Sequence, residues 1–164
     1  MAETVQGLTV KVTIRGIVNG TDGAQLVVDH SYSKTFANGT SANQIGAVWQ
    51  DETRALATTT EDLQLDALSD FQGDTMSSNN NVKLVYIRNL DDDTGDRFDV
   101  GGSGNGNSWD TMLVDATDKV SVGPGGMLLC VSPVDGFAIT AADDLAITSV
   151  DTSNYRAIIA FDNA

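Results

Sequence analysis

The chain has 164 residues, with 9 Lys or Arg against 23 Asp or Glu, so its formal net charge is −14. A charge of this sign repels phosphate groups, which argues against general binding to nucleic acid or to an anionic membrane. Hydrophobic residues make up 41% of the chain, and a domain of this length buries enough apolar surface to fold without disulfides or metal ions.

The N-terminal segment has neither the basic region nor the apolar run of a signal peptide. No stretch approaches the roughly 18 apolar residues of a membrane-spanning helix. We therefore expect a protein made in the cytoplasm, with one domain over residues 1–164 and a flexible N-terminal arm over residues 1–7.

Apolar and polar side chains alternate along much of the chain, which is typical of half-buried β-strands. Residues 8–15 alternate most clearly, with apolar even positions and polar odd ones. A turn region follows at 16–23, and the tetrapeptide Gly123-Pro124-Gly125-Gly126 fits a type II turn. The further predicted strands are residues 24–32, 45–56, 63–67, 82–89, 97–100, 120–122, 127–131, 137–139, 145–147 and 155–161.

Two segments carry extra information. Thr58 and Glu61 fit a capping box, and four apolar residues fall near helical spacing: Leu63, Ala67, Leu68 and Phe71. The alternation at Leu63 and Leu65 indicates a strand instead, so we expect a strand through Ala67 and then at most one helical turn, over Leu68–Phe71. Residues 82–89 are apolar on both faces, which predicts a central strand with its side chains in the core. Ten or eleven short strands without a long helix predict a single all-β domain, an antiparallel β-sandwich or a barrel.

Few residues favour catalysis. His30 is the one histidine, and the Gly-x-Ser-x-Gly turn of a serine hydrolase is missing. Cys130 is the one cysteine and cannot form an internal disulfide; a small buried apolar residue is the common role for such a side chain. The glycine-rich segment 101–108 lacks the Lys-Ser/Thr of a phosphate-binding loop, so we interpret it as a turning connection. We predict no enzyme activity and no cofactor.

An acidic segment offers the one candidate metal site. Asp91, Asp93 and Asp96 supply oxygen ligands around Gly95, as in a calcium loop. The glycine comes one position too early for an EF-hand, and no Glu stands at the closing position. A solvated turn between two strands is the alternative interpretation.

Aromatic side chains offer a candidate binding surface. Trp49 and Trp109 are the candidate interface residues, and together with Tyr155 they could form a platform on which a sugar stacks. Anchoring in a core or in a protein interface is the commoner use of such residues.

The order of several segments resembles the decoration, or cement, proteins found beside the major capsid genes of tailed bacteriophages. The segments that carry the resemblance are 43–54, 61–65, 68–73, 82–89, 100–102, 122–126, 131–133 and 155–159. The resemblance implies a jelly-roll-like sandwich on the outer capsid surface of the virion, bound to the major capsid protein, with neither enzymatic activity nor a cofactor. Cyclic symmetry would suit a three-fold axis of an icosahedral lattice, so a trimer is expected.

A second hypothesis is a glycan-binding module of a phage tail fibre or of another surface-adhesion protein. It depends on exposed aromatic residues and on the acidic segment 91–99. A signal on a glycan array, or a melting temperature that shifts with calcium, would support this second hypothesis.

Overall fold

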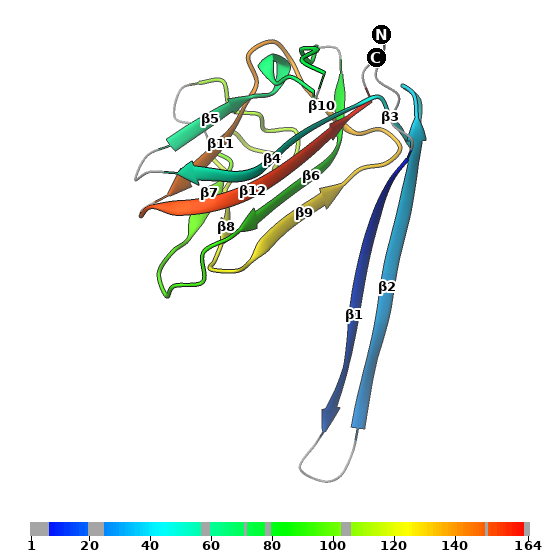
Figure 1. The fold of residues 1–164 in the computed structure, drawn as a ribbon, viewed down its shortest axis with the longest axis vertical. Helices are drawn as coiled ribbons and strands as arrows, with labels where there is room; N and C mark the ends of the chain where they lie inside the picture. Colours follow the sequence, from blue (N-terminus) through cyan, green and yellow to red (C-terminus); the bar gives the residue numbers. More distant parts are fainter. Residues whose placement is uncertain are drawn as a thin grey trace.

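The computed structural model describes residues 7–19, 25–56, 60–70, 72–77, 80–102, 106–149 and 151–162. These residues form twelve strands and one short 3₁₀ turn (Figure 1). The strands are β1 (Leu8–Asn19), β2 (Gln25–Asn38), β3 (Gln44–Ile45), β4 (Ala47–Leu56), β5 (Thr60–Gln64), β6 (Asn81–Asn89), β7 (Phe98–Val100), β8 (Val120–Val122), β9 (Met127–Val131), β10 (Phe137–Ala138), β11 (Asp144–Ser149) and β12 (Ser153–Phe161). Apart from Gly7, the predicted N-terminal arm lies outside the described residues.

Nine strands build the body of the molecule as two antiparallel sheets. The five-stranded sheet runs β10-β6-β12-β4, with β9 also paired to β6, and the four-stranded sheet runs β5-β11-β7-β8. The chain crosses from one sheet to the other at most of its connections. The prediction of an all-β sandwich is therefore confirmed.

The main core fills the space between the two sheets. Inward side chains alternate along each strand, as Val85 and Ile87 do on β6 and as Tyr155, Ala157 and Ile159 do on β12. The four-stranded sheet supplies their partners, which include Phe98, Val100, Leu145 and Ile147. This alternation is what a sheet buried against a second sheet requires.

The five-stranded sheet is apolar on its outer face as well. Leu84 and Ala160 are buried there beneath Phe36 and Ile45, in a second hydrophobic cluster. Strand β6 is therefore covered on both faces and has neighbours on both edges. The prediction of a central strand at residues 82–89 is confirmed, and the cover on both faces explains why this segment lacks the usual alternation.

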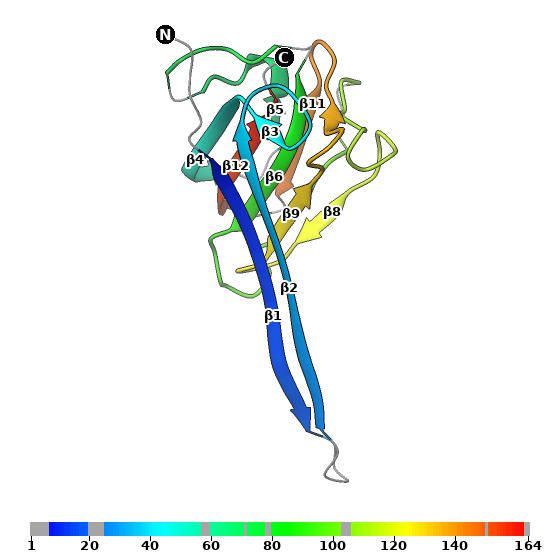
Figure 2. The same ribbon diagram turned by 90° about the vertical axis from the view of Figure 1, so that its right-hand side faces the viewer.

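The two N-terminal strands extend from the body as a long hairpin. We call this hairpin (β1 and β2) the arm; it is distinct from the N-terminal arm predicted over residues 1–7. They pair antiparallel through twelve consecutive positions, from Leu8 opposite Phe36 to Asn19 opposite Gln25. Figures 1 and 2 show the arm extending far beyond the sandwich and diverging from it. Gly16, which the sequence placed in a turn, lies inside β1 opposite Val28, because the ladder of paired backbone groups continues past it.

One local prediction was wrong. The one helical turn among the described residues occupies Leu65–Ala67. Leu68 already has extended backbone, so the turn predicted over Leu68–Phe71 does not begin there; Phe71 itself lies outside the described residues. The loop before β11 explains the shift, because the Leu65 N–H donates to the Asp143 carbonyl and Asp66 accepts from the Ala142 N–H. These contacts draw the chain into its turn three residues early.

A buried ion pair ties the end of the chain to β6. Lys83 Nζ lies 3.3 Å from Asp162 Oδ2, and both side chains are 3% exposed. Lys83 also donates to the Val134 carbonyl, while Asp162 accepts hydrogen bonds from the backbone and side chain of Asn81. Both charges therefore have the additional hydrogen bonds that a buried pair requires.

Candidate functional site

The arm has one apolar and one polar face. Because directly paired residues share a face, Val10, Val12 and Ile14 of β1 lie on the same side as Tyr32 and Phe36 of β2. The opposite face is polar over most of its length and carries two cross-strand contacts. Thr9 and Thr35 are hydrogen-bonded through their hydroxyls, and Arg15 pairs with Asp29 at 2.9 Å.

The base of the arm is fixed to the body. Phe36 is fully buried against Leu84 and Ala160 of the five-stranded sheet, and Leu8 and Val10 pack beside it. Backbone hydrogen bonds in the connection to β4 add to this contact, for example from the Gly39 N–H to the Ile45 carbonyl. The arm therefore leaves the body at a defined angle.

The outer part of the arm exposes large apolar side chains. Seven large hydrophobic residues of the described chain are exposed, and four of them lie on the arm: Ile14 (57%), Ile17 (60%), Val27 (66%) and Tyr32 (41%). Such a concentration on one element marks an interaction surface rather than the scattered exposure of an ordinary monomer.

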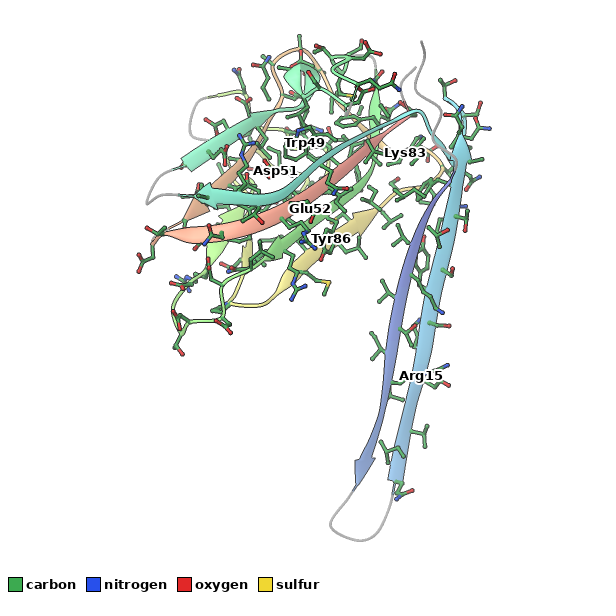
Figure 3. The ribbon with its side chains drawn as sticks, in the orientation of Figure 1. Arg15, Trp49, Asp51, Glu52, Lys83 and Tyr86 are labelled. Carbon is green, nitrogen blue, oxygen red and sulfur yellow. The ribbon has the colours of Figure 1, made fainter. Side chains whose placement is uncertain are left out.

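A groove of about 520 Å³ lies where the arm diverges from the body. One wall is the apolar face of β1, represented by Val10 and Val12. The other is the outer face of the five-stranded sheet, with Tyr86, Leu129 and Ile158. Figure 3 shows Glu52 and Tyr86 on the body, on strands β4 and β6 of the five-stranded sheet. Arg156 pairs with Glu52 at 2.6 Å, so the groove is an apolar space with a charged pair in its lining.

The calcium hypothesis receives no support from the geometry. Across the described ranges, no group of three or more His, Cys, Asp or Glu is arranged to hold a metal ion. Asp91 turns toward β12 instead, where its carboxylate accepts hydrogen bonds from the backbone and the side chain of Asn154. Slight desolvation and the carboxylates of Asp151, Asp91 and Asp93 raise the pKa of Asp96. This repulsion between neighbouring carboxylates favours the alternative interpretation, a solvated turn between two strands.

The aromatic platform does not form. Trp109 is buried in the main core, where its Nε1–H donates to the Ala138 carbonyl at 2.7 Å and its ring packs edge-on against Phe137. Tyr155 is fully buried. Trp49 is half-buried on β4 and lines a separate hollow of about 500 Å³ with Gln50 and Asp70. Of the two tryptophans proposed for an interface, Trp49 alone has an accessible surface.

The two candidate nucleophilic or basic residues have ordinary surroundings. His30 is exposed on the apolar face of the arm, opposite Ile14. Cys130 lies half-buried on β9 and packs against the main core, and burial raises the pKa of its thiol. A raised thiol pKa lowers the population of the reactive thiolate at neutral pH.

The strongest electrostatic network is structural. Arg54 of β4 lies between Glu61 of β5 and Asp51, and the Tyr155 hydroxyl donates to Glu61 at 2.8 Å. The hydrogen bond to Glu61 raises the pKa of Arg54, while burial, followed by the same carboxylate, raises the pKa of Tyr155. The network links strands of both sheets along one side of the sandwich.

Comparison with known proteins adds no family assignment. No protein-family model matches the chain, and no curated protein is significantly similar to it. The described residues contain no helix of the length and hydrophobicity needed to cross a membrane. The functional interpretation therefore depends on the arm, the groove and the sequence resemblance.

Proposed function

We propose that the chain is a virion structural protein that binds the outer surface of a mature phage capsid and bridges neighbouring copies of the major capsid protein. The observation that carries this proposal is the arm, on which the large apolar side chains of Ile14, Ile17, Val27 and Tyr32 are exposed. A fold with such an uncovered element is completed by a neighbouring protein, as expected for an assembly component.

The charge and the sequence resemblance support the same class. A net charge of −14 favours solubility and opposes non-specific association of the acidic chains. The segment order resembles capsid decoration proteins, which implies contact with the major capsid protein. We propose a trimer, because a three-fold axis of the shell presents three equivalent surfaces.

The glycan-binding alternative has lost its main basis. Two of the three aromatic residues that could have formed a stacking platform, Trp109 and Tyr155, are in the core. The acidic segment 91–99 holds no group of ligands suited to calcium. No specific observation now favours that alternative over a structural role.

Co-sedimentation with capsids tests the proposal. Purified protein is mixed with expanded heads of the phage that encodes it, and with unexpanded heads as the matched control. We expect saturable binding at a fixed number of copies per expanded head. Failure to sediment with expanded heads would overturn the proposal, and a specific signal on a glycan array would then favour the adhesion alternative.

A further inference from the structure

Near the outer end of its described part, the arm is apolar on both faces; we call this part, Ile17 with Val27 and Val28, the tip. Ile17 and Val27 lie opposite each other on the face that is polar elsewhere, and they are 60% and 66% exposed. Val28, on the other face, continues the apolar stripe of Ile14. Strands with apolar residues on both faces are typically covered from both sides.

The groove at the base of the arm has apolar walls on two sides, so it would cover both faces of an inserted strand. Val10 and Val12 line it from the arm, and Leu129 and Ile158 line it from the body. Figure 1 shows the arm and the five-stranded sheet separating toward the tip, so the space between them opens outward. Met127 is 62% exposed at this groove, which leaves a large apolar side chain uncovered there as well.

A single chain cannot bring its own tip into its own groove. On β1, the residues that line the groove run from Leu8 to Thr13. Ile17 of the tip lies beyond them on the same strand. Leu8 and Ile17 are nine positions apart along the extended strand, about 30 Å at a rise of roughly 3.4 Å per residue. The twelve consecutive pairs of β1 and β2 contain no bulge at which the hairpin could fold back.

We propose that the tip of the arm inserts into the groove of a second copy of this chain. Each copy then donates one tip and receives one, and such a head-to-tail contact closes into a ring when the rotation between copies is cyclic. The contact covers Ile17 and Val27 of one copy and Met127 of the next. It concerns copies of the chain in solution and does not depend on binding to a capsid.

Charge favours a second copy as the occupant. Residues 7–38, which contain the arm, have three basic and two acidic residues, a net charge of +1. Residues 39–164 have six basic and twenty acidic residues, a net charge of −14. Two bodies repel each other strongly. The outer part of the arm, residues 15–29, carries Arg15 against Asp22 and Asp29, a net charge of −1, so it meets far weaker repulsion from the body of another copy than a second body would. Contact through the arm is therefore the electrostatically least costly way for two copies to associate.

The oligomeric state of the full chain tests this inference. We expect light scattering coupled to size-exclusion chromatography to give a mass of two or more chains. The double variant Ile17→Asp/Val27→Asp places charge on exposed tip residues and should give the mass of one chain. Met127→Glu alters the receiving groove instead and should have the same effect.

A matched control adds the same charge to the arm away from the tip. Ser31→Asp/Ser33→Asp changes two exposed positions on the polar face of β2 and should keep the wild-type mass. All variants should fold as the wild type does, as measured by circular dichroism, since the changed side chains are exposed in a single chain. A monomeric wild-type protein, or an oligomer that both the tip and the groove variants leave intact, would overturn the inference.

Disulfide trapping tests the pairing of tip and groove directly. In a Cys130→Ser background, Val27→Cys and Met127→Cys chains are produced separately and together. A covalent dimer that forms under mild oxidation only when both chains are present supports insertion of the tip. A dimer from Val27→Cys chains alone would show contact between arms and overturn the proposed pairing.

Discussion

At the centre of the body, burial and hydrogen bonding oppose ionisation of Tyr155. Its hydroxyl donates to Glu61 and its side chain is fully buried, and together these raise its pKa. An unfolded tyrosine ionises near pH 10. Above that pH the unfolded chain loses this proton while the folded chain keeps it, so the linked stability falls as pH rises.

We therefore expect the free energy of unfolding to fall above about pH 10, by up to about 1.4 kcal/mol per pH unit from this residue. Chemical denaturation of the wild type and of Tyr155→Phe between pH 7 and pH 11 measures it. The difference between the two proteins should be flat below pH 9 and should shift in favour of the variant above pH 10. A difference that is constant across the range would contradict the argument.

Val114 combines a backbone conformation and an exposure that are both unusual for valine. It is 90% exposed and its φ is 80°, a left-handed conformation that a β-branched residue rarely adopts. Asn tolerates this conformation better, so Val114→Asn should raise the free energy of unfolding by about 1 kcal/mol. Urea denaturation measures the change. The control Val134→Asn replaces an exposed valine that lacks positive φ and should have no such effect.

At the scale of elements, the attachment of the arm depends on the cluster around Leu84. This side chain is 3% exposed beneath Phe36, on the outer face of β6. Leu84→Ala should cost about 2–5 kcal/mol in unfolding free energy, through lost burial and the cavity left behind. A cost below about 0.5 kcal/mol would show that the outer face is not a packed core.

The same substitution should loosen the arm more than the sandwich. Hydrogen exchange should accelerate for amides of β1 and β2 near the base, because Leu8, Val10 and Phe36 lose their support. Amides of β11, which lies in the other sheet, should keep their protection. Ser33→Ala, at an exposed position on the polar face of β2, is the control and should leave the exchange of the arm unchanged.

The elements could largely be predicted from the sequence, but their placement could not. The alternation at residues 8–15 predicts a strand correctly, because a period of two is a local property of the chain. The same alternation fits a strand in the sandwich and a strand in a free arm, since both have one apolar face. The sequence signal for a free arm was the apolar pair Ile17 and Val27, because this pair interrupts the otherwise polar face of the hairpin.

The candidate site was harder to predict, because it depends on tertiary packing that local sequence patterns do not show. Trp109 and Tyr155 looked like interface or stacking residues, and tertiary packing placed both in the core. Their polar atoms find partners there, Ala138 and Glu61, which no sequence spacing reveals. The groove combines β1 with β6, β9 and β12, so it exists only once distant segments meet.

At the scale of the whole molecule, the acidic body and the apolar arm predict different responses to salt. If acidic side chains of the body face basic groups of the capsid, docking should weaken as ionic strength rises. Association of copies through the arm should persist, because apolar burial is not screened. Binding to expanded heads and the oligomeric mass, both measured between 50 mM and 1 M NaCl, separate the two contacts. Docking that does not change with salt would show that the capsid interface is apolar and that the charge serves solubility.

The unbroken ladder of the arm also makes it a molecular ruler. Its twelve pairs run without a register shift, whereas the β12 pairings within the body contain irregularities. Two residues added to each strand would preserve which side chains share a face and would move the tip outward by about 7 Å. One residue added to each strand would invert the faces beyond the insertion. The length of this hairpin, counted in steps of two residues, would then set the spacing between the copies that it joins.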